Sequence, residues 1–408
     1  MVAPLRRGLR AGPATPPDQN PPAPPPAAAG QEEIRRQNLG AVLRYVHVHG
    51  PTSRAELTSR LGLNRSTIGT LAADLVASGL VSEDVPTTAR RAGRPSLVVT
   101  PRSERVYAHA VSIEPHRLRA ARVGLGGHIL HLRESPRAPG TALLDTIDDL
   151  VALLRAMPHD PGADTVCAGG AVAVADTARD EDGAVPAALD AALGTAEPDR
   201  PGFVAGDMAD LAALAEHTRG VAAGIADLLY LYGDVGISAG IVTGGRLITG
   251  HDGHSGKVGH MVVNPHGHRC VCGSRGCWDT EAGTTALLRR AGAPAGTSPL
   301  AVVRAAALGG TAARDALYGV ADWLGFGVAN LVNVFNPDVV VFGGNLREVY
   351  AAGAATVRRR LDTMALPASR EHLQLRAGAL GADAPLIGAA EIAFENLLTD
   401  PLNGVVAG

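Results

Sequence analysis

Residues 259–278 read GHMVVNPHGHRCVCGSRGCW and hold three of the four cysteines of this 408-residue chain. Cys270, Cys272 and Cys277 fall within a span of eight residues. Three thiolates and one imidazole form a tetrahedral set that Zn²⁺ prefers, and four protein ligands leave no position for a reactive water. The stretch therefore predicts a structural zinc site. Cys167 stands alone in an apolar segment, so we expect it to be an ordinary buried thiol.

The spacing alone leaves the histidine ligand open. His260 precedes the first cysteine by ten residues, whereas His266 and His268 are closer to it in sequence. His251 and His254 also lie nearby, and an isolated histidine of this kind is usually a solvated surface residue.

The residues around this stretch alternate between strands and helices, and the pattern occurs twice. The expected strands are 106–113, 119–124 and 128–133 in the first copy and 227–232, 236–243 and 246–250 in the second. A later apolar run, VVVF at 339–342, is followed by two glycines and is typical of a buried parallel strand that delivers a glycine turn to a cleft. The repetition predicts a two-lobed α/β domain, and small ligands usually bind between lobes.

The first hundred residues follow another plan. Residues 1–30 contain nine prolines and almost no large apolar side chains, which predicts a disordered arm. Ser53 and Glu56 form a capping box before a short helix, and Asn64 is a good N-cap for the next helix. Three helices followed by two short strands around an arginine-rich hairpin predict a winged helix-turn-helix.

These patterns divide the chain into four parts. We expect a proline-rich arm over 1–30, a winged helix-turn-helix domain over 31–102, a two-lobed domain over 103–400 with its lobe boundary near 213–226, and a tail over 401–408. No apolar run is long enough to span a membrane, and no secretory signal is recognisable in the arm. We therefore expect a cytoplasmic protein.

Charge is distributed unevenly along the chain. The net charge is +2 over residues 1–30, +3 over 31–100 and −8 over the remainder. A basic front on an acidic body is expected where only the front contacts a polyanion, although an excess this small also arises by chance.

The winged helix places candidate DNA contacts on two segments. The recognition helix begins near Arg65, which can donate a bidentate pair to guanine or bind a phosphate. The polar residues of its first turns are Arg65, Ser66, Thr67 and Thr70. Three further arginines of the hairpin can enter a minor groove or hold phosphates, unless they form a solvated wing tip. These are Arg90, Arg91 and Arg94.

The cysteine stretch resembles the ROK family (repressors, open reading frames and sugar kinases), whose motif reads G-E-x-G-H, nine residues, then C-x-C-G-x-x-G-C-x-E. The resemblance extends from about 105 to 398 and includes GDVGISAGIVTGGRLITG at 233–250 and FGVANLVNVFNPDVVVFGGNL at 326–346. The winged helix, closing with GRPSLVVTP at 93–101, is similar to that of the family's repressors. The resemblance implies an actin/hexokinase-like α/β fold and makes His260 the fourth zinc ligand.

The resemblance also identifies kinase parts that are altered here. Family kinases begin with a D-x-G-G-T phosphate turn, where this chain reads SIEPH at 112–116. Glutamate repels phosphate, and proline lacks the N–H that would bind it. The general base of the family's N-D-A motif becomes Asp207 in Gly206-Asp207-Met208, which leaves at most a vestigial base. We therefore expect no enzymatic activity.

The presumed ligand site has changed as well. The glutamate of G-E-x-G-H is replaced by Lys257, the only lysine of the chain, and the glutamate after the last cysteine is replaced by Asp279. Lys257 either binds an anionic group of the effector or marks a pocket that has drifted out of use. The effector contacts implied by the resemblance are Gly206, Asp207, Lys257, His260 and Asp279.

The sequence thus predicts a DNA-binding transcriptional regulator, with repression as the favoured mode. Its partners would be a double-stranded operator and a sugar, or a phosphorylated or acidic sugar, and the chain would form a homodimer or homotetramer located at the nucleoid when bound to DNA. Two alternatives remain: an ATP-dependent sugar kinase that carries a DNA-binding domain, and a DNA-binding protein that needs no effector.

Overall fold

The computed structural model describes residues 30–85, 96–138, 140–158, 164–175, 183–194, 201–234, 236–294 and 296–403. The expected disordered arm, apart from its last residue, lies outside the described residues. So do the wing arginines Arg90, Arg91 and Arg94 and most of the expected tail.

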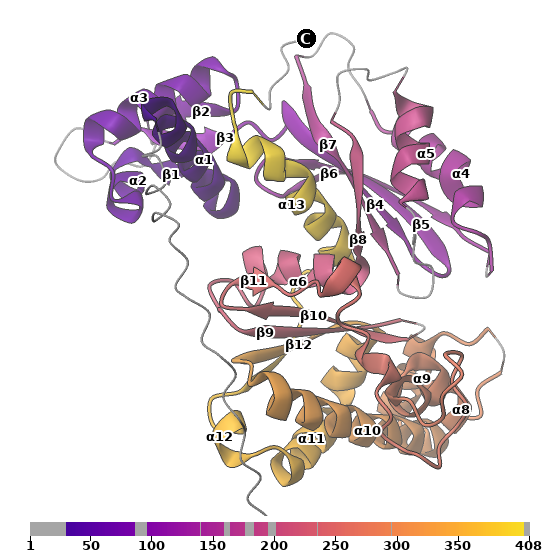
Figure 1. Ribbon diagram of the computed structural model, residues 1–408. Helices are drawn as coiled ribbons and strands as arrows, with labels where there is room; N and C mark the ends of the chain where they lie inside the picture. Colours follow the sequence, from indigo (N-terminus) through magenta and orange to yellow (C-terminus); the bar gives the residue numbers. More distant parts are fainter. Residues whose placement is uncertain are drawn as a thin grey trace, which may run out of the picture.

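The N-terminal part of the described chain forms a small winged head, drawn in indigo and violet in Figure 1. Its helices are α1 (Gln31–His49), α2 (Arg54–Leu61) and α3 (Arg65–Ala77). Its sheet has the order β1-β3-β2, with β1 at Thr52–Ser53, β2 at Val81–Asp84 and β3 at Val98–Pro101. The strand β1 pairs with β3 and was not expected, because two residues are too short to produce an alternating pattern.

Both expected helix caps in the head are present. The Ser53 side chain accepts the N–H of Glu56 and starts α2, whereas the Asn64 side chain accepts the N–H of Thr67 and starts α3. Gly62 ends α2 in the left-handed region at φ 67°, which glycine adopts without steric cost. The tight turn between α2 and α3 is therefore set by local sequence.

The first lobe is built on a five-stranded sheet of order β6-β5-β4-β7-β8. Its strands are β4 (Val106–Ile113), β5 (Arg117–Gly124), β6 (Ile129–Pro136), β7 (Val166–Val174) and β8 (Phe203–Asp207). Helices α4 (Ile147–Arg155) and α5 (Ala184–Leu193) cover the outer face of this sheet, where one apolar cluster joins both helices to the strands.

The second lobe repeats this plan, with a sheet of order β11-β10-β9-β12-β13. Its strands are β9 (Leu228–Gly233), β10 (Ile237–Thr243), β11 (Arg246–Leu247), β12 (Val339–Gly344) and β13 (Gln374–Ala377). The outer helices are α7 (Trp278–Ala282), α8 (Thr284–Arg290), α9 (Pro299–Ala307), α10 (Thr311–Phe335), α11 (Asn345–Met364) and α12 (Pro367–Arg370). The VVVF run forms the first four residues of β12. These four residues are fully buried, and the strand is parallel to both of its neighbours, as predicted.

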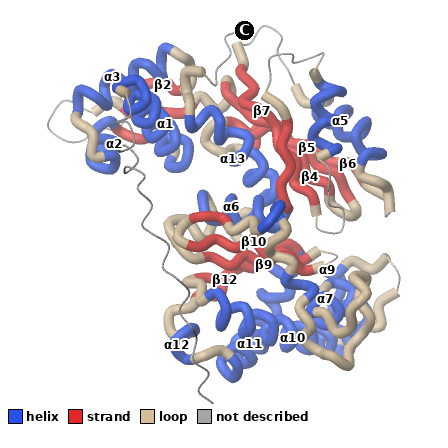
Figure 2. The backbone as a smooth tube through the Cα atoms, viewed as in Figure 1, coloured by secondary structure: helices blue, strands red, loops and turns tan. Residues whose placement is uncertain are grey.

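Two helices lie between the sheets of the two lobes (Figure 2). They are α6 (Met208–Thr218), which follows β8, and α13 (Ala384–Thr399), which lies near the C-terminal end of the described residues. A Cβ at Gly388 of α13 would lie 1.8 Å from the carbonyl oxygen of Leu211 in α6. A Cβ at Gly240 of β10 would lie 2.4 Å from the carbonyl oxygen of Ala209. Glycine therefore allows the backbones on both sides to approach α6 closely.

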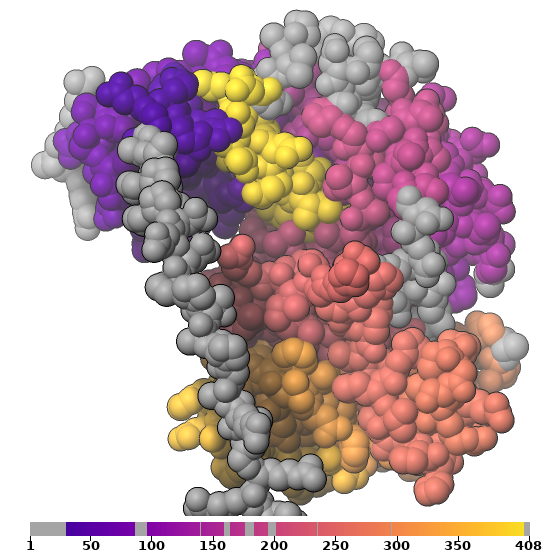
Figure 3. Space-filling view, viewed as in Figure 1, coloured from indigo at the N-terminus to yellow at the C-terminus, as the bar shows by residue number. Residues whose placement is uncertain are grey.

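The winged head shares its core with the two lobes. One apolar cluster contains Leu43 and Val46 of α1 together with Phe394 and Leu398 of α13, and it continues onto the inner faces of both sheets. The space-filling view shows α13, in yellow, between the indigo head and the magenta first lobe (Figure 3). The head is therefore docked through α1 on the last helix.

Candidate functional site

The four residues of the expected zinc site come together in the second lobe. One ligand atom from each of His260, Cys270, Cys272 and Cys277 lies within 4.8 Å of all the others. Cys272 Sγ and Cys277 Sγ are 3.6 Å apart, as are Cys270 Sγ and His260 Nδ1. A tetrahedral ion with Zn–S bonds of about 2.3 Å separates its sulfur ligands by roughly 3.8 Å, so this cluster fits one metal ion.

The loop that carries the ligands is shaped by short-range pairing. Isolated bridges join Val262 to Cys277 and Arg269 to Arg275. Gly276 has φ 71°, and a Cβ there would lie 1.5 Å from the carbonyl oxygen of Asn264. Only glycine fits such a position, and it folds the loop back so that Cys277 faces the first two cysteines.

Two of the thiols differ in acidity. Burial raises the pKa of Cys277 to about 12, and its neighbouring thiols add to that shift. Hydrogen bonds, first of all from the backbone at Ser274, lower the pKa of the exposed Cys272. A divalent ion would need Cys277 as a thiolate, so binding would release the proton from the buried thiol.

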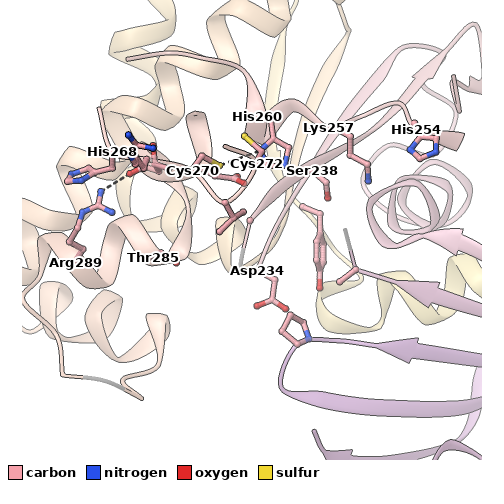
Figure 4. A pocket seen from close by; sticks show the side chains of 18 residues that line it. Asp234, Ser238, His254, Lys257, His260, His268, Cys270, Cys272, Thr285 and Arg289 are labelled. Carbon is pink, nitrogen blue, oxygen red and sulfur yellow. Dashed lines mark hydrogen bonds between the residues drawn. The ribbon is translucent and has the colours of Figure 1, made fainter. Parts of the chain in front are cut away.

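A pocket of about 490 Å³ opens beside the metal cluster (Figure 4). Its wall contains His260, Cys270 and Cys272 from the cluster, together with Lys257 and Asp279. Asp279 Oδ1 accepts the backbone N–H of Ile237 at 2.6 Å, which holds the carboxylate at the start of β10. A metal ion in the cluster would therefore fix one wall of this pocket.

The ammonium of Lys257 is paired inside the protein. Its Nζ lies 2.8 Å from Asp207 Oδ2, and these side chains are 23% and 12% exposed, respectively. Asp207 is also the N-cap of α6, because its Oδ1 accepts the N–H of Ala209 at 2.9 Å. The residue at the position of the family's general base thus forms an ion pair that joins the two lobes.

Acidic side chains occupy the turns that follow β4 and β9. Glu114, which is 5% exposed, follows β4 and accepts hydrogen bonds from Ser112 and Arg117. Asp234 follows β9, lines the pocket and points toward the strands of the first lobe (Figure 4). Burial raises the pKa of Asp234, and the charge of Glu114 raises it further. The negative charge of Glu114 therefore disfavours the ionised form of Asp234.

The recognition-helix residues lie at the start of α3. Arg65, Ser66 and Thr70 are exposed, and Thr67 is half-buried. The Ser66 hydroxyl donates to Asn64 and the Thr70 hydroxyl to the carbonyl of Ser66. These local bonds fix the polar face, and the guanidinium of Arg65 extends from it.

Three further residues line the pocket and were not predicted from the sequence: Asp234, Thr285 and Arg289. The signal for Asp234 was available, because it interrupts a glycine turn after a buried strand. Thr285 and Arg289 come from helix α8, whose amphipathic pattern does not distinguish a pocket wall from a solvated surface.

Two family models match this chain: the ROK family over residues 110–396 and the MarR family over 40–91. The xylose repressor of Bacillus subtilis (strain 168) is 24% identical over 385 residues, which cover 91% of this chain and 98% of that protein. The N-acetylglucosamine repressor of Escherichia coli O157:H7 is 25% identical over 368 residues, 83% of this chain and 88% of that protein. A glucokinase of Halalkalibacterium halodurans is 31% identical, but over only 44% of this chain.

Solved structures confirm the predicted fold class. A ROK family transcriptional regulator described as a homolog of the Escherichia coli MLC protein aligns with a TM-score of 0.72 at 22% identity, over 91% of this chain and 98% of that one. A ROK glucokinase from Streptomyces griseus aligns with a TM-score of 0.59 at 26% identity, over 70% of this chain and 98% of that one. With more than half of its residues matched by the family model, and a winged helix of MarR type in front, this chain belongs to the ROK family.

Proposed function

We propose that this protein is a DNA-binding transcriptional repressor whose two-lobed domain has given up phosphoryl transfer and senses a sugar. The observation that carries the proposal is the combination of a winged head, with the polar start of α3 exposed, and a ROK domain that has Glu114 and Pro115 at the position of the family's phosphate turn. Repressors are among the relatives that match over nearly the whole chain.

Selection of bound duplexes from a random pool tests this proposal directly. We expect enrichment of a paired motif, because a symmetric dimer presents two recognition helices to two half-sites. A second selection in the presence of individual sugars should reduce the recovery of that motif for one of them. Absence of any preferred duplex at low salt would contradict the proposal, and a motif that no sugar affects would favour the effector-independent alternative.

Loss of kinase activity follows from three changes at the site. Glu114 places a carboxylate where phosphate would approach, Pro115 removes a backbone donor, and Lys257 occupies the carboxylate of Asp207. Each missing catalytic group commonly costs about 10²–10³ in rate. We therefore expect ADP release over a panel of sugars to stay at the level of the sugar-free control. Sugar-dependent ATP turnover would instead support the kinase alternative.

Arg65 is proposed to read a base edge. Arg65→Ala should weaken binding to the selected duplex about 5–150-fold, the equivalent of roughly 1–3 kcal/mol, and relax discrimination at one base pair. Fluorescence anisotropy with single-base variants of the duplex measures both effects. Arg304→Ala, at an exposed position of α9 in the second lobe, is the control and should leave affinity unchanged. A uniform loss over all duplexes would assign Arg65 to a phosphate.

The pocket wall carries charges of both signs, so neutral sugars and phosphorylated or acidic sugars are both candidate effectors: besides its acids it contains Lys257, Arg269 and Arg289. Lys257 already pairs with Asp207, and Asp279 and Asp234 add carboxyl groups to the pocket wall. An anionic ligand would compete with Asp207 for the ammonium of Lys257, whereas the guanidinium groups of Arg269 and Arg289 would attract it. The proposed contacts remain Gly206, Asp207, Lys257, His260 and Asp279, and a thermal-shift panel of neutral and acidic sugars distinguishes the two effector classes.

Zn²⁺ is the metal that the Cys₃His donor set suits best. With all four positions filled by protein ligands, the ion would supply no water for hydrolysis and would act on structure alone. His260, Cys270, Cys272 and Cys277 would hold it, and His260 and Cys270 would at the same time fix the pocket wall. We thus propose that the metal keeps the effector site in shape.

Among the described residues, no helix is both long and apolar enough to cross a bilayer. The proposed partner, a double-stranded operator, places the protein at the bacterial nucleoid in the cytoplasm. We propose a homodimer or homotetramer, because paired half-sites need two copies of the head.

A further inference from the structure

The C-terminal end of helix α1 in the head is held by an arginine from between the lobes. Arg219, the C-cap of α6, donates from Nη1 to the carbonyl oxygen of His47 at 2.9 Å. The same Nη1 donates to the carbonyl of Gly126 in the β5–β6 hairpin, also at 2.9 Å. The last carbonyls of a helix have no partner within it and attract cations. The end of α1 is therefore capped by α6 and tied to the first lobe.

The His47 side chain closes the same junction from the other side. It is fully buried, and its Nδ1 accepts the backbone N–H of Gly126 at 3.0 Å. Its Nε2 lies 3.0 Å from Glu391 Oε2 of α13 and 2.6 Å from Arg219 Nη2. Arg219 Nε donates to the other oxygen of Glu391 at 2.6 Å. One buried cluster thus joins the head, the hairpin and both interlobe helices.

The charges of this cluster support one another. Burial alone would raise the pKa of Glu391, but the hydrogen bond from His47 and the charge of Arg219 outweigh it and hold that pKa below its usual value. Burial also lowers the pKa of His47.

The opposite end of α6 lies at the ligand pocket. Its N-cap, Asp207, pairs with Lys257 of the second lobe, and Lys257 lines the pocket. Eleven residues separate these two ends, which corresponds to about 16 Å of helix. A ligand that changes the partner of Lys257 therefore acts directly on Asp207, the N-cap of α6. The other end of α6 caps α1.

The surroundings of α6 leave it little room to bend. The backbones of Gly240 and Gly388 approach it closely on two sides. Glu216, one turn before Arg219, is fully buried and accepts the backbone N–H of Leu380 at 2.9 Å. A helix packed in this way shifts as a unit, because packed interiors do not deform continuously.

We infer that helix α6 couples the ligand pocket to the head, with the Asp207–Lys257 ion pair as its input and the contacts of Arg219 with His47 and Glu391 as its output. The inference rests on the proposed function for its biological meaning. Arg219 acts on DNA through α1 and is a positioning residue. The coupling itself is a property of the chain that can be measured without a known effector.

A double-mutant cycle with Lys257→Met and Arg219→Gln tests the coupling. The two sites are too far apart to contact each other, and independent sites have additive effects. We expect Lys257→Met to change the Kd for the selected duplex at least fivefold in the presence of Arg219 and less than twofold in the Arg219→Gln background. Equal fold-changes in both backgrounds, or no change in either, would overturn the inference.

A matched control comes from an exposed ion pair between α1 and α13. Arg44 Nη2 lies 2.6 Å from Glu395 Oε1, both side chains are exposed, and among the described residues neither forms a hydrogen bond or ion pair with α6. Arg44→Gln removes an arginine that links the same two helices, and its effect should be additive with that of Lys257→Met. If the Arg44→Gln and Lys257→Met cycle gave a coupling of the same size, any weakening of the contact between head and α13 would be enough to alter the effect of Lys257→Met. That result would contradict a specific role of α6.

Hydrogen exchange separates this inference from the proposed function. If no duplex is preferred, repression fails as a function, but exchange of the backbone amides of residues 47–53 still reports on the junction. We expect Lys257→Met to change that exchange when Arg219 is present and to leave it unchanged in the Arg219→Gln background. Arg219→Lys, which keeps the charge, is the second variant if Arg219→Gln does not fold, and it should retain part of the coupling.

Discussion

Cys277→Ser should abolish metal binding and lower the melting temperature by roughly 10 °C, on the basis that losing a structural metal costs about 4 kcal/mol or more. Cys277 is the buried thiol of the cluster, and its bridge to Val262 closes the loop. Serine has a similar shape but is a poor zinc ligand, so three donors would remain. The wall of the pocket that contains His260 and Cys270 would then lose its anchor.

Metal content by mass spectrometry and melting by calorimetry measure both effects. Cys167→Ser is the matched control, since this cysteine lies outside the cluster, and it should retain the metal and its response to a chelator. Addition of a chelator to the unmodified protein should reproduce the melting temperature of Cys277→Ser. A variant that melts unchanged, or an unmodified protein that a chelator does not affect, would contradict the assignment of a structural metal.

Gly388→Ala should destabilise the protein by about 3 kcal/mol, the upper part of the range for overpacking a core. The new Cβ would lie 1.8 Å from the carbonyl oxygen of Leu211, which belongs to the backbone of α6. Neither partner can rotate away, so α13 and α6 must separate. Because α13 also supports the head through α1, we expect weaker DNA binding as well as a lower melting temperature.

Gly319→Ala provides the control with the opposite sign. This glycine also lies inside a helix, α10, but its nearest neighbour is the flexible end of the Arg290 side chain at 3.2 Å. Alanine is favoured over glycine in a helix by up to about 1 kcal/mol, so the variant should be as stable as the original or slightly more stable. Calorimetric melting of both variants decides the matter, and equal destabilisation would show that close backbone approach is not the cause.

Local sequence was sufficient to predict much of this fold. The caps at Ser53 and Asn64 are single-residue signals that act over one helical turn, and the structure has both. The strand β12 was predictable because, in an α/β protein, a short continuous apolar run is typical of a parallel strand that is buried on both faces of the sheet. The gathering of His260, Cys270, Cys272 and Cys277 was predictable because these residues lie close together in the chain and belong to a specific family motif.

Contacts between distant segments were not predictable in this way. Nothing in the local pattern shows that Lys257 finds Asp207, fifty residues away, or that His47 finds Glu391, which lies 344 residues away. From the sequence alone, Lys257 was a cation without an identified partner. In the structure its partner is Asp207 of the same chain. Pairings of this kind depend on how the lobes and the head pack against one another. Local sequence patterns do not reveal that packing.

The docking of α1 on α13 has a consequence for biosynthesis. The head is translated before the helix on which it rests, and residues 50–383 lie between α1 and α13. Nascent chains, and products of premature stop codons before α13, would carry a genome-reading module without its support, so operator occupancy should depend on completed translation. The long sequence separation between the two helices also predicts slow final assembly, because closing so large a loop is entropically costly.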